Sequence, residues 1–217
     1  MRSHRDRRAG YRHRWLCAGP AGGVNLADGV SVRRATRDDA ASIAGIHVDA
    51  WRHNYRGWIA ETTLAGLDVA ARAAAWRSQL EAGAVVFAGT HADIHADTHT
   101  DELLGWVSVG PFRQSESARP EVRTLTPGWV ELYGFYVAPR AQGQGVGSAL
   151  WQAALAWCLD QGYREVGLWV IAGNAPAVRF YQRCGFRDRE LDQNFEIAGQ
   201  PLVEKLMARP LVPRPRA

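Results

Sequence analysis

The chain has 217 residues, of which 47% are hydrophobic and 22% charged, so it holds enough apolar material for one packed core. It has no apolar run of membrane-spanning length, and residues 1–15 lack the apolar stretch of a signal peptide, so we expect a cytoplasmic protein without a membrane partner. An odd number of widely spaced cysteines excludes a disulfide framework and a zinc cluster: Cys17, Cys158 and Cys184.

The net charge of +4 comes from the start of the chain. Residues 1–30 hold six arginines and two aspartates, which leaves 20 basic and 20 acidic residues in the rest. Because residues 31–217 carry no net charge, they lack the basic surface that binds a polyanion, and we expect no nucleic-acid partner. We expect residues 1–30 to form a flexible basic extension. Nucleic-acid binding by this arm stays open as an alternative.

Apolar spacing predicts one domain over residues 31–207, followed by a Pro-rich tail over residues 208–217. Runs of β-forming residues predict strands at residues 31–35, 84–88, 103–109, 129–137, 165–171, 186–192 and 201–207. Helical spacing of apolar residues, with caps and terminal glycines, predicts four helices at residues 36–52, 68–83, 146–161 and 174–185. This order indicates an α/β (α+β) fold around one sheet.

A polar repeat separates the second and third predicted strands. His91, His95 and His99 recur every four residues with aspartates between them, so a helix would place the three imidazoles on one face, where a metal could bind. A short connection between strands rarely forms two helical turns. We therefore expect a solvated loop and no metal, with metal binding as the alternative.

The most informative segment is a strand end, a turn with three glycines and a helix start, at residues 136–148. Gly143, Gly145 and Gly147 alternate, which lets successive backbone N–H groups turn toward one point in front of the helix terminus, as a pyrophosphate requires. A P-loop would need a lysine before Ser148, and a dinucleotide-binding turn would need a different glycine spacing. A tight turn without a ligand is the remaining alternative.

Two motifs in this region resemble those of the GNAT superfamily of N-acyltransferases. Gln142, Gly145 and Gly147 fill the defined places of that family's acyl-CoA turn, Gln/Arg-x-x-Gly-x-Gly/Ala. The family's later pattern Asn-x-x-Ala-x-x-x-Tyr-x-x-x-Gly-Phe is matched by Asn174, Ala177, Tyr181, Gly185 and Phe186. The resemblance covers residues 31 to about 207 and implies a mixed, mostly antiparallel seven-stranded sheet, splayed at its centre and flanked by four helices.

The resemblance implies acetyl-CoA as co-substrate. In this family the strand before the turn is bulged and leaves backbone groups free for the pantetheine arm, and the N–H of Val137 would polarise the thioester carbonyl. The residues implied to bind the coenzyme are Phe135, Tyr136, Val137, Gln142, Gly143, Gln144, Gly145, Val146, Gly147, Ser148, Asn174, Ala177 and Tyr181.

Two residues are candidates for proton transfer. Tyr181 follows Asn174 by seven residues, close to two helical turns, so both can face one ligand, and the resemblance implies that Tyr181 protonates or holds the leaving sulfur. Aromatic packing is its alternative. Glu131 lies four residues before Phe135 and is expected on the same face; the resemblance implies that it accepts the amine's proton, often through water. Its alternatives are a solvated or salt-bridged edge residue, or substrate binding.

The acceptor pocket is expected near the first helix, where the family builds its wall. His47, Trp51, Tyr55 and Trp58 lie in and just after that helix and would suit an apolar or cationic body. We expect direct transfer in a ternary complex to a primary amine of a small molecule or an amino-acid-like compound. The alternatives are a protein N-terminus or lysine, a non-catalytic acyl-CoA-binding or regulatory module, and an acyl-cysteine route through Cys184. A homodimer is left open.

Overall fold

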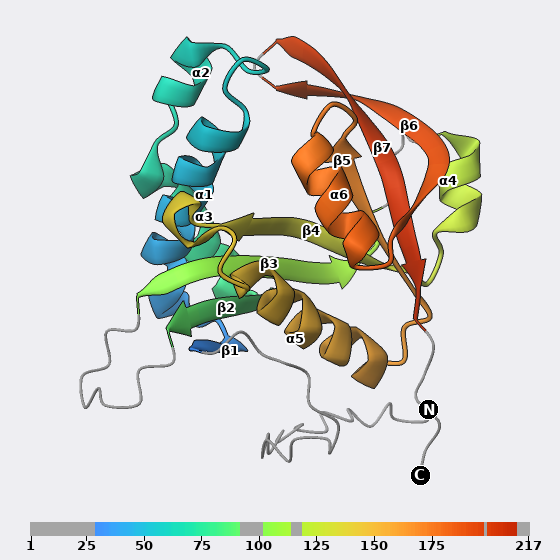
Figure 1. Ribbon diagram of the computed structural model, residues 1–217, viewed down its shortest axis with the longest axis horizontal. Coiled ribbons are helices and arrows are strands. Elements are labelled where there is room, and N and C mark those ends of the chain that lie inside the picture. Colours follow the sequence, from blue (N-terminus) through green and yellow to red (C-terminus); the bar gives the residue numbers. More distant parts are fainter. Residues whose placement is uncertain (1–28, 92–101, 114–118, 198, 212–217) are drawn as a thin grey trace, which may run out of the picture.

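The computed structural model describes residues 29–91, 102–113, 119–197 and 199–211. Seven strands form one sheet with the order β1-β2-β3-β4-β5-β7-β6, and every neighbouring pair is antiparallel except β4 and β5 (Figure 1). The strands are β1 (Val30–Arg34), β2 (Val85–His91), β3 (Leu103–Pro111), β4 (Val130–Val137), β5 (Glu165–Ile171), β6 (Arg187–Ile197) and β7 (Gln200–Pro210). The predicted mixed, mostly antiparallel sheet is confirmed.

The four predicted helices are all present, and two short helices accompany them. The helices are α1 (Ala40–Asn54), α2 (Glu61–Ala65), α3 (Val69–Glu81), α4 (Pro120–Leu125), α5 (Val146–Asp160) and α6 (Ala175–Arg183), with short 3-10 turns η1 (Arg37–Asp39) and η2 (Pro139–Ala141). Only α2 and α4 were not predicted, because helices of five and six residues are too short to show a period. No helix in the described part of the chain has the length and apolarity needed to cross a membrane.

Two sequence expectations concern residues that the structure leaves undescribed. Most of the basic extension, residues 1–28, lies outside the described ranges. His95 and His99 of the polar repeat also lie outside them, and His91 is exposed at the end of β2.

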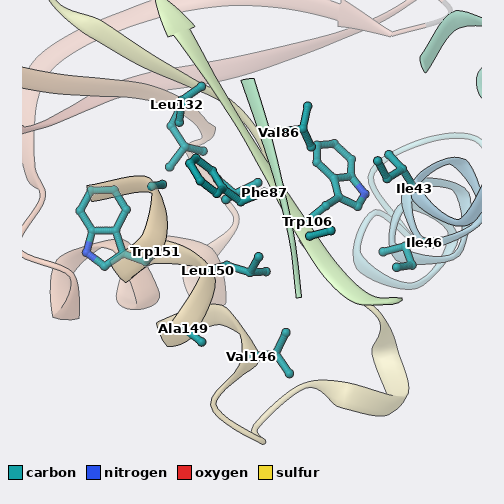
Figure 2. Close-up of a cluster of buried hydrophobic side chains, with 14 of the residues drawn as sticks. Ile43, Ile46, Val86, Phe87, Trp106, Leu132, Val146, Ala149, Leu150 and Trp151 are labelled. Carbon is teal, nitrogen blue, oxygen red and sulfur yellow. The ribbon is translucent and has the colours of Figure 1, made fainter. Parts of the chain in front are cut away.

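Helices cover both faces of the sheet. On one face α5 contacts β1, β2 and β3, and on the other α1 contacts β3 and β4 and packs against α3. Figure 2 shows the two resulting layers of the core, with Trp106 and Ile43 on one side of the strands and Phe87, Leu150 and Trp151 on the other.

A β-bulge in β4 decides which way its side chains point. Ser108 of β3 pairs with Gly134 and Val109 pairs with Leu132, so Tyr133 is an extra residue without a partner. Because one residue is added, the alternation of faces reverses along the strand. The family resemblance implied such a bulge.

The bulge overturns one expectation from the sequence. Glu131 pairs with Gly110 and Phe135 with Val107, and since these partners are three residues apart on β3, Glu131 and Phe135 lie on opposite faces. The expectation that they share a face was wrong, because strict period two does not hold across a bulge. Glu131 instead shares its face with Tyr136.

The sheet opens between β4 and β5. These strands pair only at Val130 with Val166 and at Glu131 with Gly167, and beyond Glu131 they diverge. Ala138 donates its N–H to Leu104 of β3 (2.8 Å), so by alternation the N–H groups of Val137 and Phe135 face the gap toward β5. The splayed centre of the predicted sheet thus exposes a free backbone edge.

Candidate functional site

A cavity of about 840 Å³ lies between α1, the bulged strand β4, α6 and the β6–β7 hairpin, and its size suits a small-molecule site. The predicted site residues that line it are His47, Trp51, Tyr55, Glu131, Phe135, Tyr136, Asn174, Ala177 and Tyr181. The lining leaves out Trp58, Val137 and residues 142–148. Trp58 lies instead near Tyr55 and against Gly173.

The glycine turn presents a row of free donors. Gly143 and Gly145 have φ of +78° and +85°, a backbone conformation that glycine adopts at little cost, and α5 begins directly afterwards at Val146. Ala149 is the first residue to donate its N–H to the turn, to Gly145 (3.0 Å). The N–H groups of residues 143–148 have no acceptor within the described ranges, so this segment fits an anion with several oxygens.

Helix α6 brings its three predicted residues to one wall of the cavity. Asn174 caps the helix, and its Oδ1 accepts the N–H of Ala177 (3.1 Å), while its amide nitrogen donates to no other described residue. Burial raises the pKa of Tyr181, and its hydroxyl donates to no group in the described part of the chain. Tyr181 therefore keeps its proton at neutral pH and has it available for a ligand.

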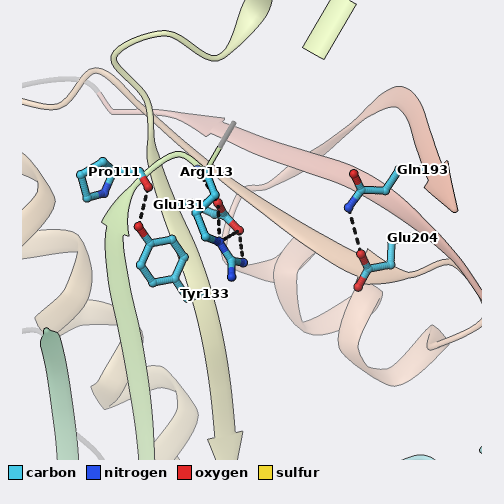
Figure 3. Close-up of polar contacts among 6 residues, drawn as sticks. All are labelled: Pro111, Arg113, Glu131, Tyr133, Gln193 and Glu204. Carbon is cyan, nitrogen blue, oxygen red and sulfur yellow. Dashed lines mark hydrogen bonds and ion pairs between the residues drawn. The ribbon is translucent and has the colours of Figure 1, made fainter. Parts of the chain in front are cut away.

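Glu131 is a buried carboxylate paired with the more exposed side chain of Arg113 (Figure 3). Its side chain is 2% exposed, and it accepts the backbone N–H of Arg113 at Oε2 (2.8 Å) and the guanidinium of Arg113 at both carboxylate oxygens. The carboxylate in turn raises the pKa of Arg113, which stacks over Tyr133 at 4.4 Å. The salt-bridged alternative for Glu131 is the one seen, although the residue is buried rather than at an edge.

An aromatic cluster forms the α1 side of the cavity. His47 stacks on Tyr136 with ring centroids 4.9 Å apart, and the Nε1 of Trp51 donates to the hydroxyl of Tyr136 (2.9 Å). Burial and the nearby charge of Arg72 lower the pKa of His47 to about 3, and neither ring nitrogen has a partner among the described residues. His47 is thus a neutral ring at pH 7.

Two polar residues of the site carried no sequence signal. Arg113 follows β3 in a polar stretch, and Glu204 lies on β7, where its carboxylate accepts a hydrogen bond from Nε2 of Gln193 (3.1 Å) (Figure 3). Both line the cavity. The sequence held one indirect indication of Arg113: the carboxylate of Glu131 lies in an apolar strand, and a buried charge requires a partner of opposite charge.

The cysteine route finds no support in the geometry. Cys184 lies at the end of α6 outside the cavity lining, and burial raises the pKa of its thiol to about 11. A protonated thiol is a poor nucleophile at neutral pH. Cys158 is buried inside α5, and its pKa is raised to about 12.

The chain is similar to known N-acetyltransferases. An uncharacterised N-acetyltransferase, YuaI of Bacillus subtilis, is 31% identical over 175 residues, which cover 81% of this chain and 90% of that protein. The mycothiol acetyltransferase of Pseudarthrobacter chlorophenolicus is 42% identical over 87 residues, which cover 40% of this chain and only 24% of that protein.

Solved structures share the fold. An N-acetyltransferase of Staphylococcus aureus Mu50 superimposes with a TM-score of 0.59 at 20% identity, over 84% of this chain and 99% of that one. The yncA protein of Salmonella typhimurium, solved with its cofactor acetyl-CoA, superimposes with a TM-score of 0.59 at 20% identity, over 87% of this chain and 97% of that one. The sequence model of the acetyltransferase (GNAT) family matches residues 69–186. The chain therefore belongs to the acetyltransferase (GNAT) family.

Proposed function

We propose that this protein moves an acetyl group from acetyl-CoA to a primary amine of a small-molecule or amino-acid-like acceptor, by direct transfer in a ternary complex. The observation that carries the proposal is the row of free N–H groups at residues 143–148, at the helix end beside the open edge of β4. That edge leads to a cavity that contains Tyr181 and has room for a second reactant.

Acetyl-CoA, when bound, supplies an activated acetyl thioester. The free N–H groups of residues 143–148 would hold its diphosphate, with the partial positive charge of the α5 terminus behind them. The N–H groups of Phe135 and Val137 would hydrogen-bond its pantetheine arm from the unpaired edge of β4. The free amide nitrogen of Asn174 would donate to the same arm, because its Oδ1 is engaged by the helix cap.

Tyr181 would act as the general acid. As the new C–N bond forms and the C–S bond breaks, the leaving thiolate takes the hydroxyl proton of Tyr181. The tyrosinate then recovers a proton from the nitrogen that becomes the amide. Because burial raises the pKa of Tyr181, its hydroxyl is protonated at neutral pH and carries the proton that this step requires.

The test measures coenzyme binding and turnover separately. Titration calorimetry with acetyl-CoA checks the binding, and release of the free thiol across a panel of primary amines checks the transfer. Tyr181→Phe should lower kcat by about 100-fold and leave the acetyl-CoA affinity unchanged. Tyr163→Phe, outside the cavity, is the matched control. Binding without thiol release for any amine would leave a non-catalytic module, and turnover restricted to peptides would indicate a protein acceptor.

A further inference from the structure

Two carboxylates line the cavity, those of Glu131 and Glu204. Glu131 is paired with Arg113, whereas Glu204 forms no ion pair within the described part of the chain. Building on the proposed function, we propose that Glu204 receives the ammonium group of the acceptor and takes its proton before transfer. The acceptor is then a primary amine that arrives protonated.

Glu131 is poorly placed for this task. Its side chain is 2% exposed, and both of its oxygens already accept hydrogen bonds from Arg113. An incoming ammonium group would have to compete with Arg113 for these oxygens. Glu131 is therefore best understood as the residue that fixes Arg113 against the bulge.

Glu204 is more exposed than Glu131 and forms no ion pair within the described residues. It pairs with Ile171 of β5 and Gln193 of β6, so it lies in the middle strand of this part of the sheet and is only partly exposed. Within the described part of the chain, its one hydrogen-bond partner is the neutral side-chain amide of Gln193, which donates to Oε2 (3.1 Å). The second oxygen remains available to an ammonium group, which is the kind of partner a half-buried carboxylate requires.

The charges around Glu204 suit a base. Burial raises the pKa of Glu204; the hydrogen bond from Gln193 and the charge of Arg113 partly offset this rise, and the charge of Glu131 adds to it. The other titratable groups that face it are the hydroxyls of Tyr55 and Tyr136, both neutral at pH 7 because burial raises their pKa. A carboxylate with a raised pKa holds a transferred proton better than an ordinary one.

The proton step balances without a further reagent. The ammonium nitrogen loses one proton to the carboxylate of Glu204, which gives a neutral amine with a free electron pair and a neutral carboxylic acid. Glu204 then returns the proton to water through the mouth of the cavity. The neutral amine enters the acetyl transfer already proposed, in which Tyr181 supplies the proton for sulfur.

The experiment compares three matched substitutions on an amine that the wild-type protein acetylates. Glu204→Gln keeps the shape and the hydrogen bond to Gln193, Glu131→Gln removes the other cavity carboxylate, and Glu196→Gln makes the same change on the exposed face of the hairpin. For each variant, kcat/KM for the amine, KM for acetyl-CoA and the pH profile from 6 to about 9.5 are measured. Glu204→Asp, which keeps the carboxylate, serves as the second variant.

Glu204→Gln should lower kcat/KM for the amine by about 100-fold near pH 7, leave KM for acetyl-CoA unchanged, and approach wild type as rising pH deprotonates the free amine. Glu204→Asp should keep the wild-type pH profile. A defect that does not change with pH, or an equal change of profile in Glu131→Gln, would overturn the role of Glu204 while the acetyltransferase stands. A wild-type protein that turns over no amine would overturn the proposed function and this inference together.

Discussion

Replacing His47 with phenylalanine should make the stability of the protein less sensitive to acid. The side chain is 9% exposed within an aromatic cluster, and burial lowers its pKa to about 3. A histidine in an unfolded chain has a pKa of about 6.5. Between these two values the unfolded chain binds a proton that the folded protein does not bind, so acid favours unfolding.

The size of the effect follows from the two pKa values. The stability that depends on neutral His47 is fully present above about pH 6.5 and falls by about 1.4 kcal/mol for each pH unit below it, down to the folded pKa. Lowering the pH from 7.5 to 5.0 should therefore remove about 2 kcal/mol through this residue. Glu204 works in the opposite direction, because its raised pKa adds stability as the pH falls, so only the difference between variant and wild type isolates His47.

Urea denaturation at pH 7.5 and 5.0, followed by circular dichroism, measures this difference. The wild-type protein should lose about 2 kcal/mol more than His47→Phe between the two pH values. His53→Phe, an exposed position on the same helix, should behave as wild type. An equal loss in wild type and His47→Phe would refute the reasoning, since it would mean that the ring is protonated within the folded protein.

Three further predictions follow from the site. Arg113→Met leaves the carboxylate of Glu131 buried without its cation and should cost about 2 kcal/mol in urea denaturation; an unchanged midpoint would contradict the ion pair. Gly145→Ala, at φ +85°, should cost about 1–2 kcal/mol and weaken acetyl-CoA binding in calorimetry, whereas Gly128→Ala, at φ +80° in the turn before β4, should cost stability alone. Asn174→Ala removes a helix cap and should cost about 1 kcal/mol by thermal unfolding; an unchanged Tm would show that the cap contributes nothing.

The main elements of the fold could be predicted because their signals are local. Apolar spacing and caps reveal α1, α3, α5 and α6: α1 and α5 each bury an apolar face against the sheet, α3 packs against α1, and α6 is marked by its Asn174 cap. The last two strands were predicted too short. Strand β6 runs to Ile197 and β7 to Pro210. The extra length of β6 was missed because this strand lies at the edge of the sheet, where polar residues remain in water and give no apolar pattern.

The site could be predicted only where one short segment carries it. The glycine turn and the start of α5 lie where the motif indicates, because backbone conformation there depends on the glycines themselves. Arg113 and Glu204 come from segments 91 residues apart with no motif, and only the folded sheet brings them to one cavity. The face of Glu131 was wrong because the extra residue arises from the pairing of β3 and β4, which the sequence of β4 alone does not contain.

The unpaired Tyr133 gives strand β4 two orientations in one short length. After it, Phe135 points to α6 and Tyr136 to α1, so neighbouring residues serve opposite compartments. Deleting one residue at this point would exchange those compartments for every later side chain of the strand, even with the composition almost intact. When related chains are aligned or recombined, the number of residues between Glu131 and the turn must therefore be kept, more strictly than the identity of the residue at position 133.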